Sequence, residues 1–146
     1  MLKLYLDTCC YNRPFDDLEQ ERNNLEAQAI KIIIKKYWNN EIKIYASDAL
    51  LFEINNIKDE IKRKKVLEVY NKLNLTNIKF SNEIIKKAYE IRKYNIKDMD
   101  SLHISYAENS NMNYFITTDK LLINASKRVK LQTKVMNPIE FVMEVM

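Results

Sequence analysis

The chain has 146 residues, of which 47% are hydrophobic, so its length and composition fit one domain with a sizeable core. It carries 24 basic and 20 acidic residues, for a net charge of +4, and its apolar stretches are far shorter than the ~20 residues of a membrane-spanning helix. It contains no glycine, which excludes a P-loop and a dinucleotide-binding fingerprint, because both need glycine where the backbone approaches phosphate.

The first half of the chain alternates strand and helix patterns. Leu2, Leu4 and Leu6 recur with the period of a strand, which ends at Asp7. This first segment lacks the apolar region of a signal peptide, so we expect a protein of the cytoplasm with no membrane segment. The next predicted elements are a loop over 8–17, a helix over about 18–38, a strand over 42–46, a helix that begins at Ser47 or Asp48, and a helix over 59–73.

The second half continues the same alternation. Its predicted elements are a short strand at 78–80, a helix that begins at Ser81, a helix over 98–111, a strand over 114–117, a short helix, a strand over 134–136, and a terminal helix introduced by Asn137 and Pro138. We therefore expect one α/β domain over residues 1–146. Its central sheet should be mostly parallel, with four to five strands and helices on both faces.

The absence of glycine also predicts where asparagine will be used. Backbone positions with positive φ must be filled by Asn or Asp, the next most tolerant residues. We expect Asn in such positions at the ends of elements, where the sequence offers Asn39, Asn40, Asn55, Asn56, Asn109, Asn111 and Asn113.

Four acidic residues fall at one edge of the predicted sheet. Asp7 and Asp119 follow strands, Glu53 lies in the helix after the second strand, and Asp100 lies in the first turn of its helix. In an open parallel sheet, ligands bind beyond the carboxyl ends of the strands. Carboxylates gathered there repel one another unless a cation neutralises them, and oxygen ligands suit Mg²⁺ or Mn²⁺. A pair of such ions can activate a water molecule to attack the phosphorus of a phosphodiester.

Each of these acids also has a plainer interpretation. Asp7 and Asp119 can simply end strands, Glu53 can be a solvated helix residue, and Asp100 can answer the helix dipole. Because all four fall on one edge, we favour a shared site. We assign Asp98 to helix capping, since residues two apart on a helix do not face the same way.

The other reactive side chains offer less. Cys9 and Cys10 are adjacent, so they fit neither a disulfide nor a zinc site and are expected to be small, half-buried residues. His103 is the only histidine, no nucleophile motif surrounds it, and we expect a structural, hydrogen-bonded side chain. If four acids form one site, the remainder carries 24 − 16 = +8, which suits a polyanionic substrate.

Taken together, the motifs resemble those of the PIN domain, the ribonuclease fold of VapC-type toxins. The matching segments are LDT (6–8), Glu53, DSLHIS (100–105) followed by Ala107, and TTD (117–119). The opening LDTCCYNRPFDD and the closing NPIEF resemble a subgroup of that family. The resemblance covers nearly the whole chain. It implies a metal-dependent endoribonuclease that acts as the toxin of a type II toxin–antitoxin pair.

The resemblance also assigns roles to particular residues. The catalytic Mg²⁺ or Mn²⁺ would be held by four carboxylates: Asp7, Glu53, Asp100 and Asp119. Thr8 or Thr117 would supply a hydroxyl that supports these ligands. Arg13, in the loop beside Asp7, is our candidate for contact with the RNA substrate. The family further implies a small antitoxin protein as partner, and homodimers are common in it.

Two other functions fit the same residues. A phosphatase could use Asp7 as nucleophile, although such enzymes usually place a second Asp where this chain has Cys9. A non-catalytic member of the same fold could bind RNA or protein and still keep all four acids. Cleavage of RNA, lost on removing Asp100, distinguishes the enzyme from the binding module.

Overall fold

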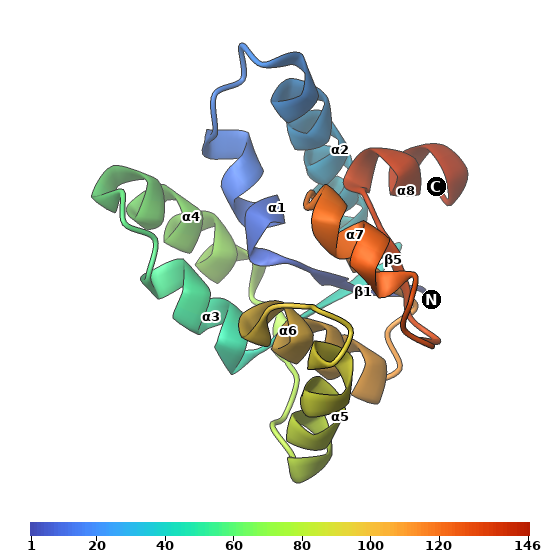
Figure 1. The fold of residues 1–146 in the computed structure, drawn as a ribbon. Coiled ribbons are helices and arrows are strands. Elements are labelled where there is room, and N and C mark those ends of the chain that lie inside the picture. Colours follow the sequence, from blue (N-terminus) through green and yellow to red (C-terminus); the bar gives the residue numbers. More distant parts are fainter.

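A five-stranded sheet forms the centre of the molecule, and all of its neighbouring strands pair in parallel (Figure 1). We describe residues 1–146 from a computed structural model. The strand order is β3-β2-β1-β4-β5. The strands are β1 (Lys3–Leu6), β2 (Lys43–Ala46), β3 (Thr76–Asn77), β4 (Tyr114–Ile116) and β5 (Lys134–Met136). The predicted α/β class and the parallel sheet are confirmed.

Eight α-helices and one short 3-10 helix, η1, connect these strands. In chain order they are α1 (Thr8–Asn12), η1 (Arg13–Phe15), α2 (Glu21–Trp38), α3 (Asp48–Asn55), α4 (Glu60–Leu73), α5 (Asn82–Arg92), α6 (Asp98–Asn109), α7 (Lys120–Ser126) and α8 (Pro138–Glu144). None of these helices has the length and apolar character needed to cross a membrane.

Helices cover both faces of the sheet, which gives the molecule two apolar cores. In Figure 1, α1, α2, α4 and α8 lie on one side of the strands, while α5 and α6 lie on the other. Leu4 and Leu6 of β1 belong to the first core, and Tyr5 belongs to the second with Phe115. Alternate side chains of a strand point to opposite faces, so β1 is buried on both sides. It therefore forms the centre of the fold.

The predicted loop over 8–17 is wrong, because its first part is helical. Asp7 caps α1 by accepting a hydrogen bond from the Thr8 amide, and Pro14 lies in the first turn of η1. Tyr11 and Cys10 of α1 are buried in the first core. Helices this short do not complete enough turns to display an apolar period, and the Asn and Pro residues favour a loop prediction.

Two further boundaries differ from prediction. The long helix begins at Glu21, so Leu18 lies in the preceding connection. The expected strand at 78–80 is wrong, since the strand is Thr76–Asn77 and Phe80 is half exposed. This strand lies at the edge of the sheet beside β2, where only a short pairing is made.

Asparagine takes every backbone position with positive φ. These positions are Asn40, Asn74, Asn95 and Asn111. Two of them, Asn40 and Asn111, were among the predicted asparagines, so the use of Asn in place of glycine is confirmed there. Asn74 ends α4 in the left-handed conformation that is commonly filled by glycine.

Candidate metal centre

The strand order places a crevice at the carboxyl ends of β1 and β4. The chain leaves β1 toward β2 on one side, whereas β4 lies on the other side, and such a switch point is where open α/β sheets bind ligands. Asp7 directly follows β1, and its amide donates to the Ile116 carbonyl of β4 at 2.9 Å. Thr117 directly follows β4, and Asp119 comes two residues later, just before α7. The residues predicted from these two strands therefore lie together.

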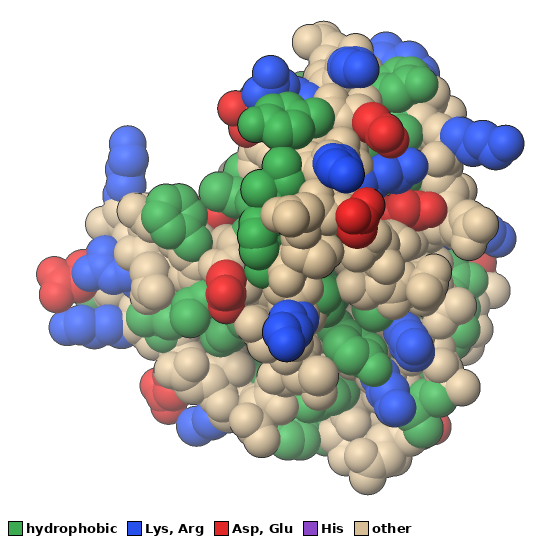
Figure 2. Space-filling view, turned by 90° about the horizontal axis from the view of Figure 1, so that it is seen from below, with side chains coloured by type: hydrophobic (Ala, Val, Ile, Leu, Met, Phe, Trp, Pro, Cys, Tyr) green, Lys and Arg blue, Asp and Glu red, His purple; other side chains and the backbone are tan.

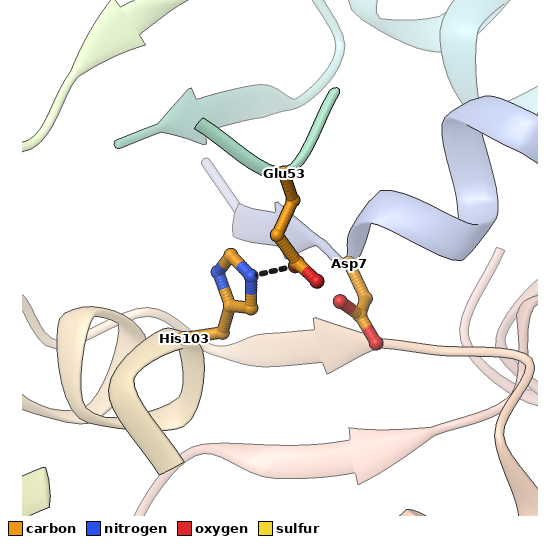
Figure 3. A group of neighbouring side chains, drawn as sticks. All are labelled: Asp7, Glu53 and His103. Atoms are coloured by element: carbon orange, nitrogen blue, oxygen red, sulfur yellow. Dashed lines mark hydrogen bonds and ion pairs between the residues drawn. The ribbon is translucent and has the colours of Figure 1, made fainter. Parts of the chain in front are cut away.

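Two carboxylates and one imidazole form a tight group in this crevice. One ligand atom each of Asp7, Glu53 and His103 lies within 4.8 Å of the others (Figure 3). Asp7 comes from the end of β1, Glu53 from α3 and His103 from α6. The group joins two of the four predicted metal ligands with a histidine to which the sequence assigned only a structural role.

Asp7 is buried and held by its neighbours on two sides. Its Oδ1 accepts from the Thr8 amide at 2.8 Å, and its Oδ2 accepts from the Thr117 hydroxyl at 2.8 Å. Cys9 Sγ lies 3.5 Å from the same Oδ2. Burial raises the pKa of Asp7, while neighbouring His103 and the Thr117 hydrogen bond act in the opposite direction.

Glu53 has a different environment from Asp7. Its Oε1 accepts from the Thr8 hydroxyl at 2.8 Å and is also hydrogen-bonded to Nε2 of His103. Burial acts to raise the pKa of Glu53, but its hydrogen bonds with His103 and Thr8 outweigh burial, so the pKa is lowered. Each of the two threonines named from the sequence thus donates to one carboxylate of the group, Thr8 to Glu53 and Thr117 to Asp7.

Asp100 and Asp119 lie beside this group and line one cavity of about 350 Å³ between α6 and α7. Burial, followed by the negative charges of Asp7 and Asp119, raises the pKa of Asp100 to about 6. Asp119 caps α7, since its Oδ1 accepts from the Leu121 and Leu122 amides. The plainer interpretation of Asp119 as a local structural residue therefore holds for one of its two oxygens.

The donor set fits a divalent cation. Asp7 and Glu53 lie in one partly buried group, and the negative charges of Asp7, Asp119 and Glu53 contribute to the raised pKa of Asp100. A cation removes this repulsion, and carboxylate oxygens are the ligands that Mg²⁺ and Mn²⁺ prefer. The assignment of Asp7, Glu53, Asp100 and Asp119 as metal ligands remains a prediction that this geometry supports.

Asp98 does not cap its helix, so that assignment is wrong. The residue that precedes α6 is Lys97, and no side chain caps this end. Asp98 instead accepts from Arg92 of α5 at 3.2 Å on the surface. The carboxylate pairs with a neighbouring helix because α5 and α6 pack side by side, which the sequence does not reveal.

Arg13 belongs to an internal network beside the site. Its Nε lies 3.1 Å from Oε1 of Glu26, which is fully buried, and its Nη2 donates to the Thr118 hydroxyl at 3.0 Å. Arg22 pairs with the same Glu26 and donates to the Thr118 carbonyl at 2.9 Å. The network fixes the segment that carries Asp119. Contact of Arg13 with RNA stays a prediction, and Glu26 is a residue that the sequence analysis missed.

A model of the PIN domain family matches residues 4–128. The chain therefore belongs to the PIN domain family. Its fold is similar to a chain in the crystal structure of VapBC2 from Rickettsia felis bound to a DNA fragment from their promoter, with a TM-score of 0.59 and 19% identity, covering 93% of this chain and 98% of that chain. No curated protein sequence matches the chain significantly.

Replacing Asp100 by Asn should stabilise the metal-free protein. Because the folded-state pKa of about 6 lies above the ordinary value of 3.8, the native state loses stability as pH rises between these values. At pH 7.5 in EDTA we expect Asp100→Asn to raise the free energy of unfolding by about 1 kcal/mol, after a discount for solvent screening. The gain should shrink as pH falls from 6 toward 4. Urea unfolding at several pH values measures this gain in stability. An equal gain at pH 4 would contradict a raised pKa of Asp100 in the folded protein.

Proposed function

We propose that this PIN domain is a divalent-metal-dependent endoribonuclease that hydrolyses RNA phosphodiester bonds. The observation that carries the proposal is the meeting of Asp7 and Glu53 at the strand ends, with Asp100 near enough for its pKa to respond to Asp7. A divalent ion held there would supply water activation and charge neutralisation at the leaving oxygen. No other part of the chain offers comparable hydrolytic chemistry.

The residues around the centre keep its acids in place. The Thr117 and Thr8 hydroxyls donate to Asp7 and Glu53, which fixes two carboxylates before any ligand arrives. Such preorganisation lowers the cost of placing charge during the reaction. Asp100 and Asp119 lie on the side of the centre that opens into the cavity between α6 and α7.

The same cavity supports a nucleic acid as substrate. Its lining includes the cations Lys97 and Arg128, and Arg128 is steadied by donating to the Tyr94 carbonyl at 3.1 Å. A phosphate next to the scissile bond would meet positive charge here, because these cations line the same cavity as Asp100 and Asp119. On the α5 side of the molecule, Lys and Arg side chains are spread over the surface rather than gathered into one patch (Figure 2). The support for RNA binding in the cavity therefore comes from its own two cations.

Cleavage of labelled RNA should depend on Mn²⁺ or Mg²⁺ and on these acids. We expect Asp7→Asn and Asp100→Asn to lower the rate by about 100-fold or more, since each removes charge that holds the ion. Glu83→Gln, which removes an exposed carboxylate from the first turn of α5, is the matched control and should cleave at the wild-type rate. Equal cleavage by the Asp100→Asn variant and the wild type would refute the catalytic assignment.

The same assay separates the alternatives. A non-catalytic PIN module would bind RNA in a gel-shift experiment and show no cleavage with either metal. A general phosphate hydrolase would act on p-nitrophenyl phosphate as well as on RNA, whereas the nuclease should leave that small ester intact.

Arg128→Ala should weaken substrate binding more than it slows the chemical step. Loss of one charge-assisted phosphate contact should raise KM by about 10-fold and leave kcat within about 2-fold. Lys127→Ala removes the neighbouring positive charge, which lies outside the cavity, and should leave KM unchanged. Initial rates over a range of RNA concentrations measure both constants. An equal response of the two variants would place the RNA elsewhere.

We further propose that the chain acts as the toxin of a type II pair and is neutralised by a small antitoxin at the acidic crevice. Membership of the PIN family and the similarity to a chain of a VapBC2 structure support this. Large apolar side chains are exposed on α3, the helix of Glu53, and on α4, and a partner would cover them: Leu51, Phe52 and Ile61.

Expression of the chain alone should arrest growth, and co-expression of a small protein encoded next to it should restore growth and co-purify with it. Growth that is unaffected by the chain, with no adjacent small gene, would refute the toxin assignment. Light scattering of the purified chain tests whether it forms a homodimer, as is common in the family.

A further inference from the structure

A continuous row of buried hydrogen bonds leads from the second core to Glu53. The Tyr5 hydroxyl lies 2.6 Å from Ser47 Oγ and 2.6 Å from Nδ1 of His103. Nε2 of His103 is hydrogen-bonded to Oε1 of Glu53, as the dashed line in Figure 3 shows. Tyr5, Ser47 and His103 are all fully buried. The row therefore has a fixed number of hydrogens to place, and water does not compete for them.

Counting these hydrogens gives the row a direction. Ser47 Oγ accepts from the Leu50 amide as the cap of α3, so its own hydrogen is available to Tyr5. The Tyr5 hydrogen then goes to Nδ1 of His103, and the hydrogen on Nε2 goes to Glu53. Every donor and acceptor of the row is satisfied in this arrangement.

The opposite direction leaves the row unsatisfied. If Tyr5 donated to Ser47 and Nδ1 donated to Tyr5, a neutral imidazole would present a bare Nε2 to a carboxylate oxygen of Glu53. Two lone pairs would then face each other, and the Ser47 hydrogen would have no acceptor in the row. A buried polar group without a partner costs about 1–3 kcal/mol.

We propose that His103 is a positioning residue rather than a metal ligand: Ser47 and Tyr5 fix its tautomer so that Nε2–H holds the Glu53 carboxylate toward the metal centre. The inference rests on the metal-dependent function proposed above. It separates His103 from Asp7 and Glu53, although all three lie within 4.8 Å of one another. Both imidazole nitrogens are already engaged inside the protein, so neither offers a lone pair to an ion.

The packing around Tyr5 supports this role. Its ring stacks on Phe115 of β4, with ring centres 5.5 Å apart and planes 10° apart, and its ring is tilted against His103. Tyr5 is also the residue of β1 just two positions before Asp7. The end of β1 thus places Asp7 in the crevice. The Tyr5 hydroxyl of the same strand orients Glu53 through His103.

The state of the imidazole is measurable without any enzymatic activity. Because His103 is the only histidine, its ring signals in a ¹⁵N–¹H long-range NMR spectrum are unambiguous. We expect a hydrogen on Nε2 and none on Nδ1, unchanged when Mg²⁺ is added. A hydrogen on Nδ1, either alone or together with one on Nε2, would overturn the proposed direction. Loss of the Nε2 hydrogen with Mg²⁺ would show a metal ligand and overturn the proposal.

Variants provide an independent measurement through Mn²⁺ affinity, determined by calorimetry. His103→Gln keeps an N–H donor near the position of Nε2 and should retain the affinity within about 3-fold, whereas His103→Leu should weaken it by about 10- to 100-fold. Tyr5→Phe keeps the stacking on Phe115 but removes the hydroxyl, and we expect a loss of about 10-fold. Tyr11→Phe is the matched control, since it removes a buried hydroxyl that has no partner.

The outcomes separate this inference from the proposed function. Equal loss of Mn²⁺ affinity in His103→Gln and His103→Leu would make His103 a ligand, even if RNA cleavage is confirmed. The expected tautomer in a protein that binds no Mn²⁺ would refute the metal-dependent function instead. Circular dichroism of each variant identifies any that fails to fold, and the NMR measurement on the wild-type protein still decides the inference in that case.

Discussion

The parallel register of β1 and β4 is the constraint on which the candidate site depends. Leu6 pairs with Ile116, so the residues that follow each strand leave the sheet at the same level. Asp7 then accepts from Thr117, and both remain buried at the edge of the sheet. A slip of one residue would turn every side chain of β1 to the other face. Leu4 and Leu6 would then leave the first core, and Asp7 would move away from Glu53. The apolar residues of the strand therefore fix the chemistry at its end.

Much of the fold is predictable from the sequence because its signals are local. An apolar strand that ends in an acid predicts both β1 and the position of Asp7, and Asn137 followed by Pro138 predicts the start of α8. The helix α1 is too short to show a period. The link from Tyr5 to His103 spans 98 residues and depends on how α6 packs on the sheet. No pattern of composition or spacing reveals such a contact, and the same is true of Asp98 with Arg92.

Two buried polar networks hold the crevice from opposite sides of the sheet. On one side Arg13 and Arg22 both pair with Glu26, and both donate hydrogen bonds to Thr118 in the segment after β4. On the other side the row from Ser47 to His103 reaches α3. Buried polar groups are costly unless paired, but once paired they hold one arrangement strongly. The acids of the centre thus come from separate elements and still share one rigid frame.

The glycine-free chain has a consequence for its denatured state. Asn at a left-handed position restricts the unfolded backbone more than glycine does, so less conformational entropy is lost on folding. Against this, a non-glycine residue in that conformation costs roughly 1 kcal/mol of strain. The two effects are of similar size and opposite sign. Turns such as the one at Asn74 can therefore dispense with glycine at little net cost, and the chain gains backbone stiffness where its helices end.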